Sequence, residues 1–241
     1  MALEPRQRTA SLGNRVDSSA GVDEGLRSYM LRVYNYMTLG LALTGVIAFG
    51  VSSSPVIVEM IYSNVVTAWA VMLAPLAFVL VFTFGINKLS TPMAQALFWA
   101  FAAVMGLSMT SIFIVYTDAS IARVFFISAS VFAAMSLYGY TTKRDLTGMG
   151  SFLMMGLFGL VLASIVNVFL ESVMMDFVVS IIGVLIFVGF TAYDTQKIKS
   201  EYDVNDSAAI REKNAVYGAL HLYLDFINLF MFMLHLFGSR D

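Results

Sequence analysis

Long apolar stretches separated by short polar breaks run along the chain from residue 29 to its C-terminal end. A helix that crosses a bilayer needs about 20 mostly apolar residues. Seven stretches meet this length and predict spanning helices at 29–51, 65–86, 93–116, 120–141, 149–170, 174–196 and 216–238. The one long break, 197–215, is charged throughout, and we interpret it as a loop. The pattern predicts an all-α polytopic membrane protein in which residues 29–241 form a single seven-helix transmembrane domain.

Composition supports the membrane assignment and narrows the chemistry. Apolar residues make up 59% of the chain and charged residues 12%, about half the charged share of a soluble domain. The net charge of −2 argues against a nucleic-acid partner. Because cysteine is absent, disulfides and thiolate metal sites are excluded. Residues 1–28 are polar and hold no apolar core of signal-peptide type, so we predict a polar cytoplasmic tail.

The distribution of basic residues predicts the orientation. With seven spans, twelve of the fourteen lysines and arginines fall on one side, in the tail, at the start of the first span (Arg32) and in the second, fourth and sixth breaks. Only Arg123 and Arg240 fall on the other side. Because basic residues favour the cytoplasmic side, we expect a cytoplasmic N-terminus and an external C-terminus.

Two aspartates lie inside the apolar stretches. Asp194 is near the end of the sixth span, and Asp225 is about nine residues into the seventh. A carboxylate at the centre of a bilayer helix costs about 2.5–3.5 kcal/mol, so such a residue is a functional candidate. Since consecutive antiparallel helices pack side by side, the two carboxyl groups could meet and titrate as a unit. The alternative is that each aspartate bonds separately to a hydroxyl, with Tyr193 and Tyr223 as the near candidates.

His221 and Asn228 stand four residues before and three residues after Asp225, on the same helix face. They are supporting candidates for the site. A His–Asp pair at this spacing can serve as a metal site or a proton relay. Without further ligands it is more typical of polar packing, so we predict no firm metal site and no cofactor.

The chain is recognisable at these residues. The segments SLYGYTTKRDLTGMGSFL (136–153), FVGFTAYDTQKIK (187–199) and LHLYLDFINLFMFMLHLFG (220–238) resemble the Bax inhibitor-1 (transmembrane Bax inhibitor motif) family, especially its bacterial members. The resemblance covers roughly Tyr29 to Gly238. It implies a location in the bacterial inner membrane and a seven-helix fold with the last helix central and six helices around it.

The resemblance also implies a function for the two acids. Asp194 and Asp225 match the family's paired aspartates, which are taken to sense pH and to gate a calcium leak. The family also has an arginine near the cytoplasmic end of the second span that contacts the pair. The nearest cation in that region here is Lys88.

We therefore expect a pH-sensitive calcium leak channel, with the calcium ion and the lipid bilayer as partners. The alternative is a regulator that binds a membrane quality-control protease through the N-terminal tail, without transport. A third interpretation, an intramembrane aspartyl protease, requires Gly-x-Gly-Asp around the second acid. Because Tyr223 and Leu224 precede Asp225 instead, we predict no enzymatic activity.

Overall fold

The structure is a computed structural model that describes the backbone of residues 5–85 and 88–240 and the side chains of residues 24–85 and 88–240. Within these residues, seven helical segments are long and apolar enough to cross a membrane. They are Glu24–Ser52, Val65–Gly85, Thr91–Val115, Asp118–Thr141, Thr147–Leu170, Val173–Ser200 and Ala208–Phe237. The predicted all-α fold and its seven spans are confirmed.

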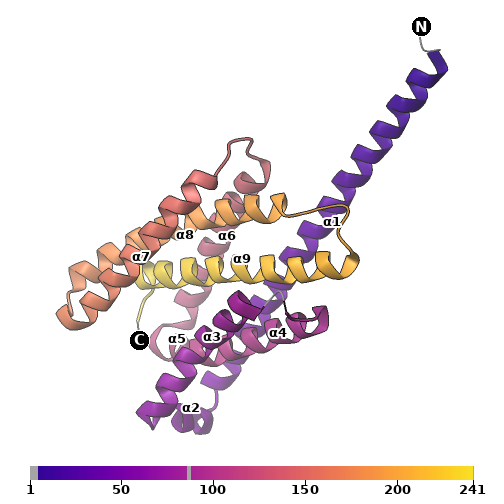
Figure 1. Ribbon diagram of the computed structural model, residues 1–241. Helices are drawn as coiled ribbons and strands as arrows, with labels where there is room; N and C mark the ends of the chain where they lie inside the picture. Colours follow the sequence, from indigo (N-terminus) through magenta and orange to yellow (C-terminus); the bar gives the residue numbers. More distant parts are fainter. Residues whose placement is uncertain (1–4, 86–87, 241) are drawn as a thin grey trace.

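The spans are built from the helices labelled in Figure 1. The first and second spans are α1 and α3, joined by the short helix α2, and the third span continues from α4 through a 3-10 turn into α5. The bounds are α1 Pro5–Ser52, α2 Pro55–Tyr62, α3 Val65–Gly85, α4 Thr91–Ser108, α5 Ile112–Val115, α6 Asp118–Thr141, α7 Thr147–Leu170, α8 Val173–Ser200 and α9 Ala208–Phe237.

Two charged regions are helical where the sequence pattern predicted otherwise. Residues 5–28, predicted as a tail, continue α1. No proline interrupts the chain between Pro5 and Pro55, and extending an existing helix adds one hydrogen bond per residue. The predicted loop 197–215 is also mostly helical, because α8 extends to Ser200 and α9 begins at Ala208. The Ser207 hydroxyl accepts a hydrogen bond from the Ile210 amide and so caps this early start of α9.

Helix α9 lies at the centre of the bundle (Figure 1). Fourteen of its 30 residues are buried, compared with two of the 21 residues of α3. The helices α1, α4, α6 and α8 pack directly against α9, whereas α3 packs mainly on α4 and α7 on α8. The expectation of six helices around the last one is therefore corrected to four, with two helices in an outer position.

The connections gather at two ends of the bundle. The N-terminal part of α1 and the α3–α4, α6–α7 and α8–α9 connections lie at one end, and α2, the α7–α8 connection and the C-terminus lie at the other (Figure 1). We call the first the basic end, because it carries twelve of the fourteen lysines and arginines of the chain. That this end faces the cytoplasm remains a prediction.

Candidate functional site

The antiparallel pair α8 and α9 forms the most extensive helix contact of the bundle. Its register follows from two close approaches. Gly218 of α9 lies against the side chain of Ile198, and Gly183 of α8 lies against the ring of Phe232. This register places position 194 opposite positions 221–222, one turn from Asp225. Because helical side chains point back toward the N-terminus of their own helix, the two aspartate side chains converge between the helices.

Asp194 and Asp225 form a buried carboxyl pair. Their carboxyl groups lie next to each other, and the residues are only 7% and 5% exposed. Because ionised carboxylates only accept hydrogen bonds, two such groups can bond to each other only when they share a proton. The second oxygen of Asp225, Oδ2, is buried and has no hydrogen-bond partner. The pair therefore lies at the α8–α9 interface with one buried oxygen that no other group satisfies.

His221 is the third titratable group of the site. Its Nδ1 atom lies 3.7 Å from Oδ2 of Asp194, and its side chain is 35% exposed. The ring of Tyr217 packs edge-on against the imidazole, with 4.7 Å between the ring centroids. The sequence spacing predicted that His221 lies on the same face of α9 as Asp225. In the structure it lies closest to Asp194, across the interface between α9 and α8. Among the described residues, no group of three or more His, Cys, Asp or Glu side chains is arranged to hold a metal ion.

The two tyrosines named as alternative partners of the aspartates make other contacts. The Tyr223 hydroxyl lies 2.6 Å from Oγ1 of Thr44, which donates to the carbonyl of Ala102, so it anchors α9 to α1 and α4. Tyr193 packs its ring against Gly150 of α7. Each tyrosine thus has another contact, and among the described residues neither hydroxyl is bonded to Asp194 or Asp225.

A chain of hydroxyl groups lies beside Asp194. The Thr195 hydroxyl donates to the Thr191 carbonyl and lies 3.0 Å from the Ser136 hydroxyl of α6. Ser136 also bonds to the hydroxyl of Tyr34 on α1. This chain links α1, α6 and α8 at the level of the carboxyl pair.

Close backbone packing holds α6 and α8 together near the site. A Cβ atom at Gly139 of α6 would meet the backbone carbonyl of Ala192, two residues before Asp194. Only glycine allows this approach. The position of Gly139 therefore helps to set the position of the α8 backbone beside the site.

Comparisons with known proteins identify the family of the chain. The sequence profile of the family described as "Inhibitor of apoptosis-promoting Bax1" matches residues 26–241. The chain belongs to the Bax inhibitor-1 family. It is 48% identical over 229 residues to the inner membrane protein YbhL of Escherichia coli strain K12, covering 94% of this chain and 97% of that one.

Further relatives come from distant bacteria. A Rickettsia prowazekii protein is 49% identical over 219 residues, or 90% of this chain and 92% of its own. A Caulobacter vibrioides protein is 42% identical over 236 residues, or 94% of each chain. The resemblance drawn from the sequence motifs is confirmed, and the chain is an integral membrane protein of this family.

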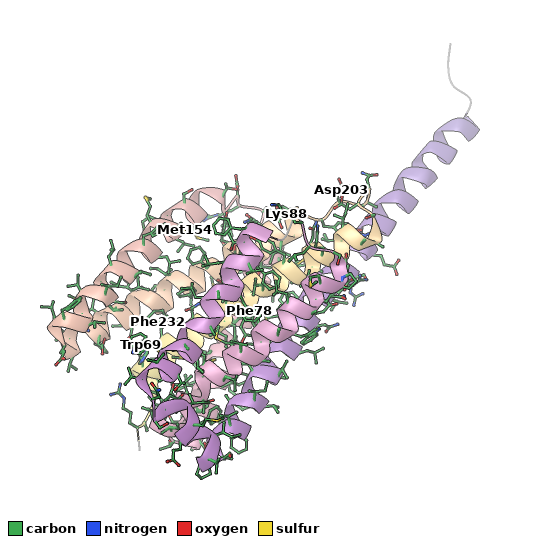
Figure 2. All side chains as sticks on the ribbon, turned by 60° about the horizontal axis from the view of Figure 1, so that its bottom comes forward. Trp69, Phe78, Lys88, Met154, Asp203 and Phe232 are labelled. Carbon is green, nitrogen blue, oxygen red and sulfur yellow. The ribbon has the colours of Figure 1, made fainter. Side chains whose placement is uncertain are left out.

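Lys88 and Asn228, which the sequence suggested as supporting residues of the site, lie apart from the Asp194–Asp225 pair. Lys88 is exposed in the turn after α3, at the same end of the bundle as Asp203 (Figure 2). No ion pair joins it to either aspartate in the part of the chain that the structure describes. Asn228 donates to the carbonyl of Leu224 in its own helix. Neither residue contributes a bond to the carboxyl pair.

A second polar cluster at the basic end was missed by sequence reasoning. Glu212 of α9 accepts hydrogen bonds from Arg32 and Tyr36 of α1 and from Gln95 of α4. Gln95 also donates to the Tyr36 hydroxyl, 2.7 Å away. These residues join three helices that are far apart in sequence, so no spacing signal marks them. Arg32 is engaged here and does not take the place of the family arginine at the aspartates.

Proposed function

We propose that this protein is a pH-sensitive calcium leak channel gated by Asp194 and Asp225. The observation that carries the proposal is the close approach of two buried carboxyl groups on neighbouring spans. A hydrogen bond between them depends on a single shared proton, so the contact between α8 and α9 depends on pH. In the closed state the pair holds this one proton.

Loss of the shared proton opens the pathway. Two unit charges 4 Å apart repel by about 4 kcal/mol at an effective dielectric constant of 20. A side-chain hydrogen bond between membrane helices contributes about 0.6 kcal/mol on average. The repulsion therefore outweighs a hydrogen bond of this kind, and the basic-end halves of α8 and α9 move apart as pH rises.

The separated carboxylates suit calcium as the transported ion. Calcium prefers oxygen ligands and takes six to eight of them, whereas two carboxylates supply four at most. The remaining ligands are water molecules, so the ion is held weakly and passes on. Weak binding is appropriate to a leak pathway, and the membrane involved is the inner membrane, as the name of YbhL states for that relative.

The proposal is tested by calcium flux into liposomes that contain the purified protein, measured across a range of pH. The wild-type flux should rise with pH, and Asp194→Asn and Asp225→Asn should each abolish this response. Asparagine keeps the shape and the hydrogen-bonding capacity of aspartate, so these variants isolate the charge.

Asp176→Asn is the matched control. Asp176 lies near the other end of α8 and accepts a hydrogen bond from Asn167, 2.9 Å away, which an asparagine oxygen can also accept. This variant should keep the wild-type pH profile. If both variants of the pair also kept it, the proposed gate would be wrong.

A further inference from the structure

A large groove opens between α1 and α6. Its volume is about 820 Å³, and its rim residues Leu31 and Leu137 are 54% and 63% exposed, so the groove opens on the side of the bundle. Both helices pack on α9, and the α9 residue Phe226 forms the floor. The small side chains of Ala129 and Ala133 on α6 leave the space between the helices unfilled.

The groove is mainly apolar and is basic at one end; the hydroxyl groups of Tyr34 and Ser136 in its lining are bonded to each other. Arg27 lines it at the basic end of α1. Across the groove, Tyr140 lines the same end of α6. The ammonium group of Lys199 donates to the Tyr140 carbonyl, 2.8 Å away, and lies 4.8 Å from the centre of the Tyr140 ring. One cationic side chain, Arg27, therefore lines this end of the mainly apolar groove, and a second, Lys199, lies beside the lining residue Tyr140.

The length of the groove corresponds to one leaflet of a bilayer. The fifteen residues from Arg27 to Leu41 extend about 21 Å along α1, because they are separated by fourteen steps of 1.5 Å. A bilayer is about 40–45 Å thick including its headgroups, so one leaflet is about 20–22 Å. The basic end lies at headgroup depth when the apolar part of the groove lies among the acyl chains.

We propose that this groove is a binding site for an anionic phospholipid. One acyl chain lies between α1 and α6 against Phe226, and the phosphate group lies at the end marked by Arg27 and Lys199. A phosphate group is favoured there because an arginine guanidinium forms paired hydrogen bonds with phosphate oxygens. The inference does not depend on calcium transport, because binding can be measured on the closed protein.

The test is binding of phosphatidylglycerol to the delipidated protein in detergent, measured by native mass spectrometry. Diacylglycerol with the same acyl chains is the neutral comparison. Arg27→Gln should weaken phosphatidylglycerol binding about fivefold, as expected for one basic residue at an anionic headgroup, and leave diacylglycerol binding unchanged. Arg123→Gln, at the opposite end of α6, should change neither.

Filling the groove tests the acyl-chain site. Ala133→Trp should remove binding of both lipids, whereas Ala134→Trp should not, because Ala134 is exposed on the same helix outside the groove lining. If Ala133→Trp fails to fold, Thr38→Phe fills the groove from the α1 side instead. Its control is Leu39→Phe, at the exposed neighbouring position. Equal lipid binding by the groove variants and their controls would overturn the proposal.

Discussion

The imidazole of His221 on α9 lies 3.7 Å from the carboxyl group of Asp194 on α8. The histidine is one turn before Asp225 in its own helix, so all three titratable groups share one helix interface. His221 is more exposed than Asp194, with 35% of its side chain accessible compared with 10%.

We predict that His221→Gln changes the pH at which calcium flux responds, without abolishing the response. The imidazole lies beside the Asp194 carboxyl group, and glutamine changes the polarity and volume next to the carboxyl pair, which shifts the pH at which the pair titrates. The measurement is the flux profile across pH in liposomes. A complete loss of pH dependence would instead make His221 the sensor and the carboxyl pair a structural contact.

Gly139→Ala should destabilise the protein by about 1–3 kcal/mol, the usual cost of overpacking a tight contact. The added methyl group meets the Ala192 carbonyl, so α6 must move away from α8. Thermal unfolding in detergent micelles measures the loss. Gly159→Ala is the control, because a Cβ atom at Gly159 meets nothing within 4 Å, and it should leave stability unchanged or slightly raised. Equal unfolding temperatures for the two variants would contradict the predicted close contact.

Glu212→Ala should lower the free energy of unfolding by about 2–3 kcal/mol, because it removes charged hydrogen bonds shared by three helices. The donors on Tyr36 and Gln95 lose their carboxylate acceptor. Glu212→Gln keeps an acceptor oxygen and should cost less. Glu201→Ala, at an exposed position of the same end, should change stability by no more than about 0.5 kcal/mol. If Glu212→Ala cost no more than Glu201→Ala, the cluster would have no stabilising role.

The orientation can be tested with reporter fusions. We predict that a reporter at Asp241 is external and that a reporter inserted at 201–207, the connection between α8 and α9, is cytoplasmic. The physical reason is the twelve-to-two distribution of basic residues. A cytoplasmic reporter signal at Asp241 would contradict the predicted orientation. The carboxyl pair would then lie nearer the external side of the membrane.

Deleting residues 1–23 separates the leak from the alternative of protease regulation. The cut leaves Gly25 and Tyr29, which contact Tyr202 of the α8–α9 connection. We expect calcium flux to survive, and any binding to a membrane quality-control protease to be lost. A Gly/Ser linker of equal length in place of the deleted segment controls for its length. Protease binding without any calcium flux in the wild type would favour the regulator.

The seven spans and the carboxyl pair could be predicted because local features determine them. A spanning helix needs only a sufficient apolar length, and consecutive helices with a short connection pack as neighbours. The approach of Asp194 to Asp225 follows from these two facts together. The roles of Lys88 and Asn228 could not be predicted in this way, because spacing gives the face of a helix and not the partner that the side chain finds.

The helical ends and the Glu212 cluster were not predictable for another reason. The charge of the residues around Ala208 predicted a loop. They form a helix instead, because they continue α9 and contact residues of α1 and α4. Arg32 and Glu212 are 180 positions apart in the sequence. Pairing over that distance depends on the arrangement of all the helices.

The Tyr223 anchor has a consequence for motion. Tyr223 and Asp225 are two residues apart and so project about 200° apart around α9. Tyr223 bonds to Thr44 of α1, while Asp225 faces Asp194 of α8. Opposite sides of α9 are therefore held by different chemistry, a pair of neutral hydroxyl groups toward α1 and a pair of carboxyl groups toward α8. We expect a change in the charge of the carboxyl pair to loosen the α8 side of α9 while the contact with α1 persists.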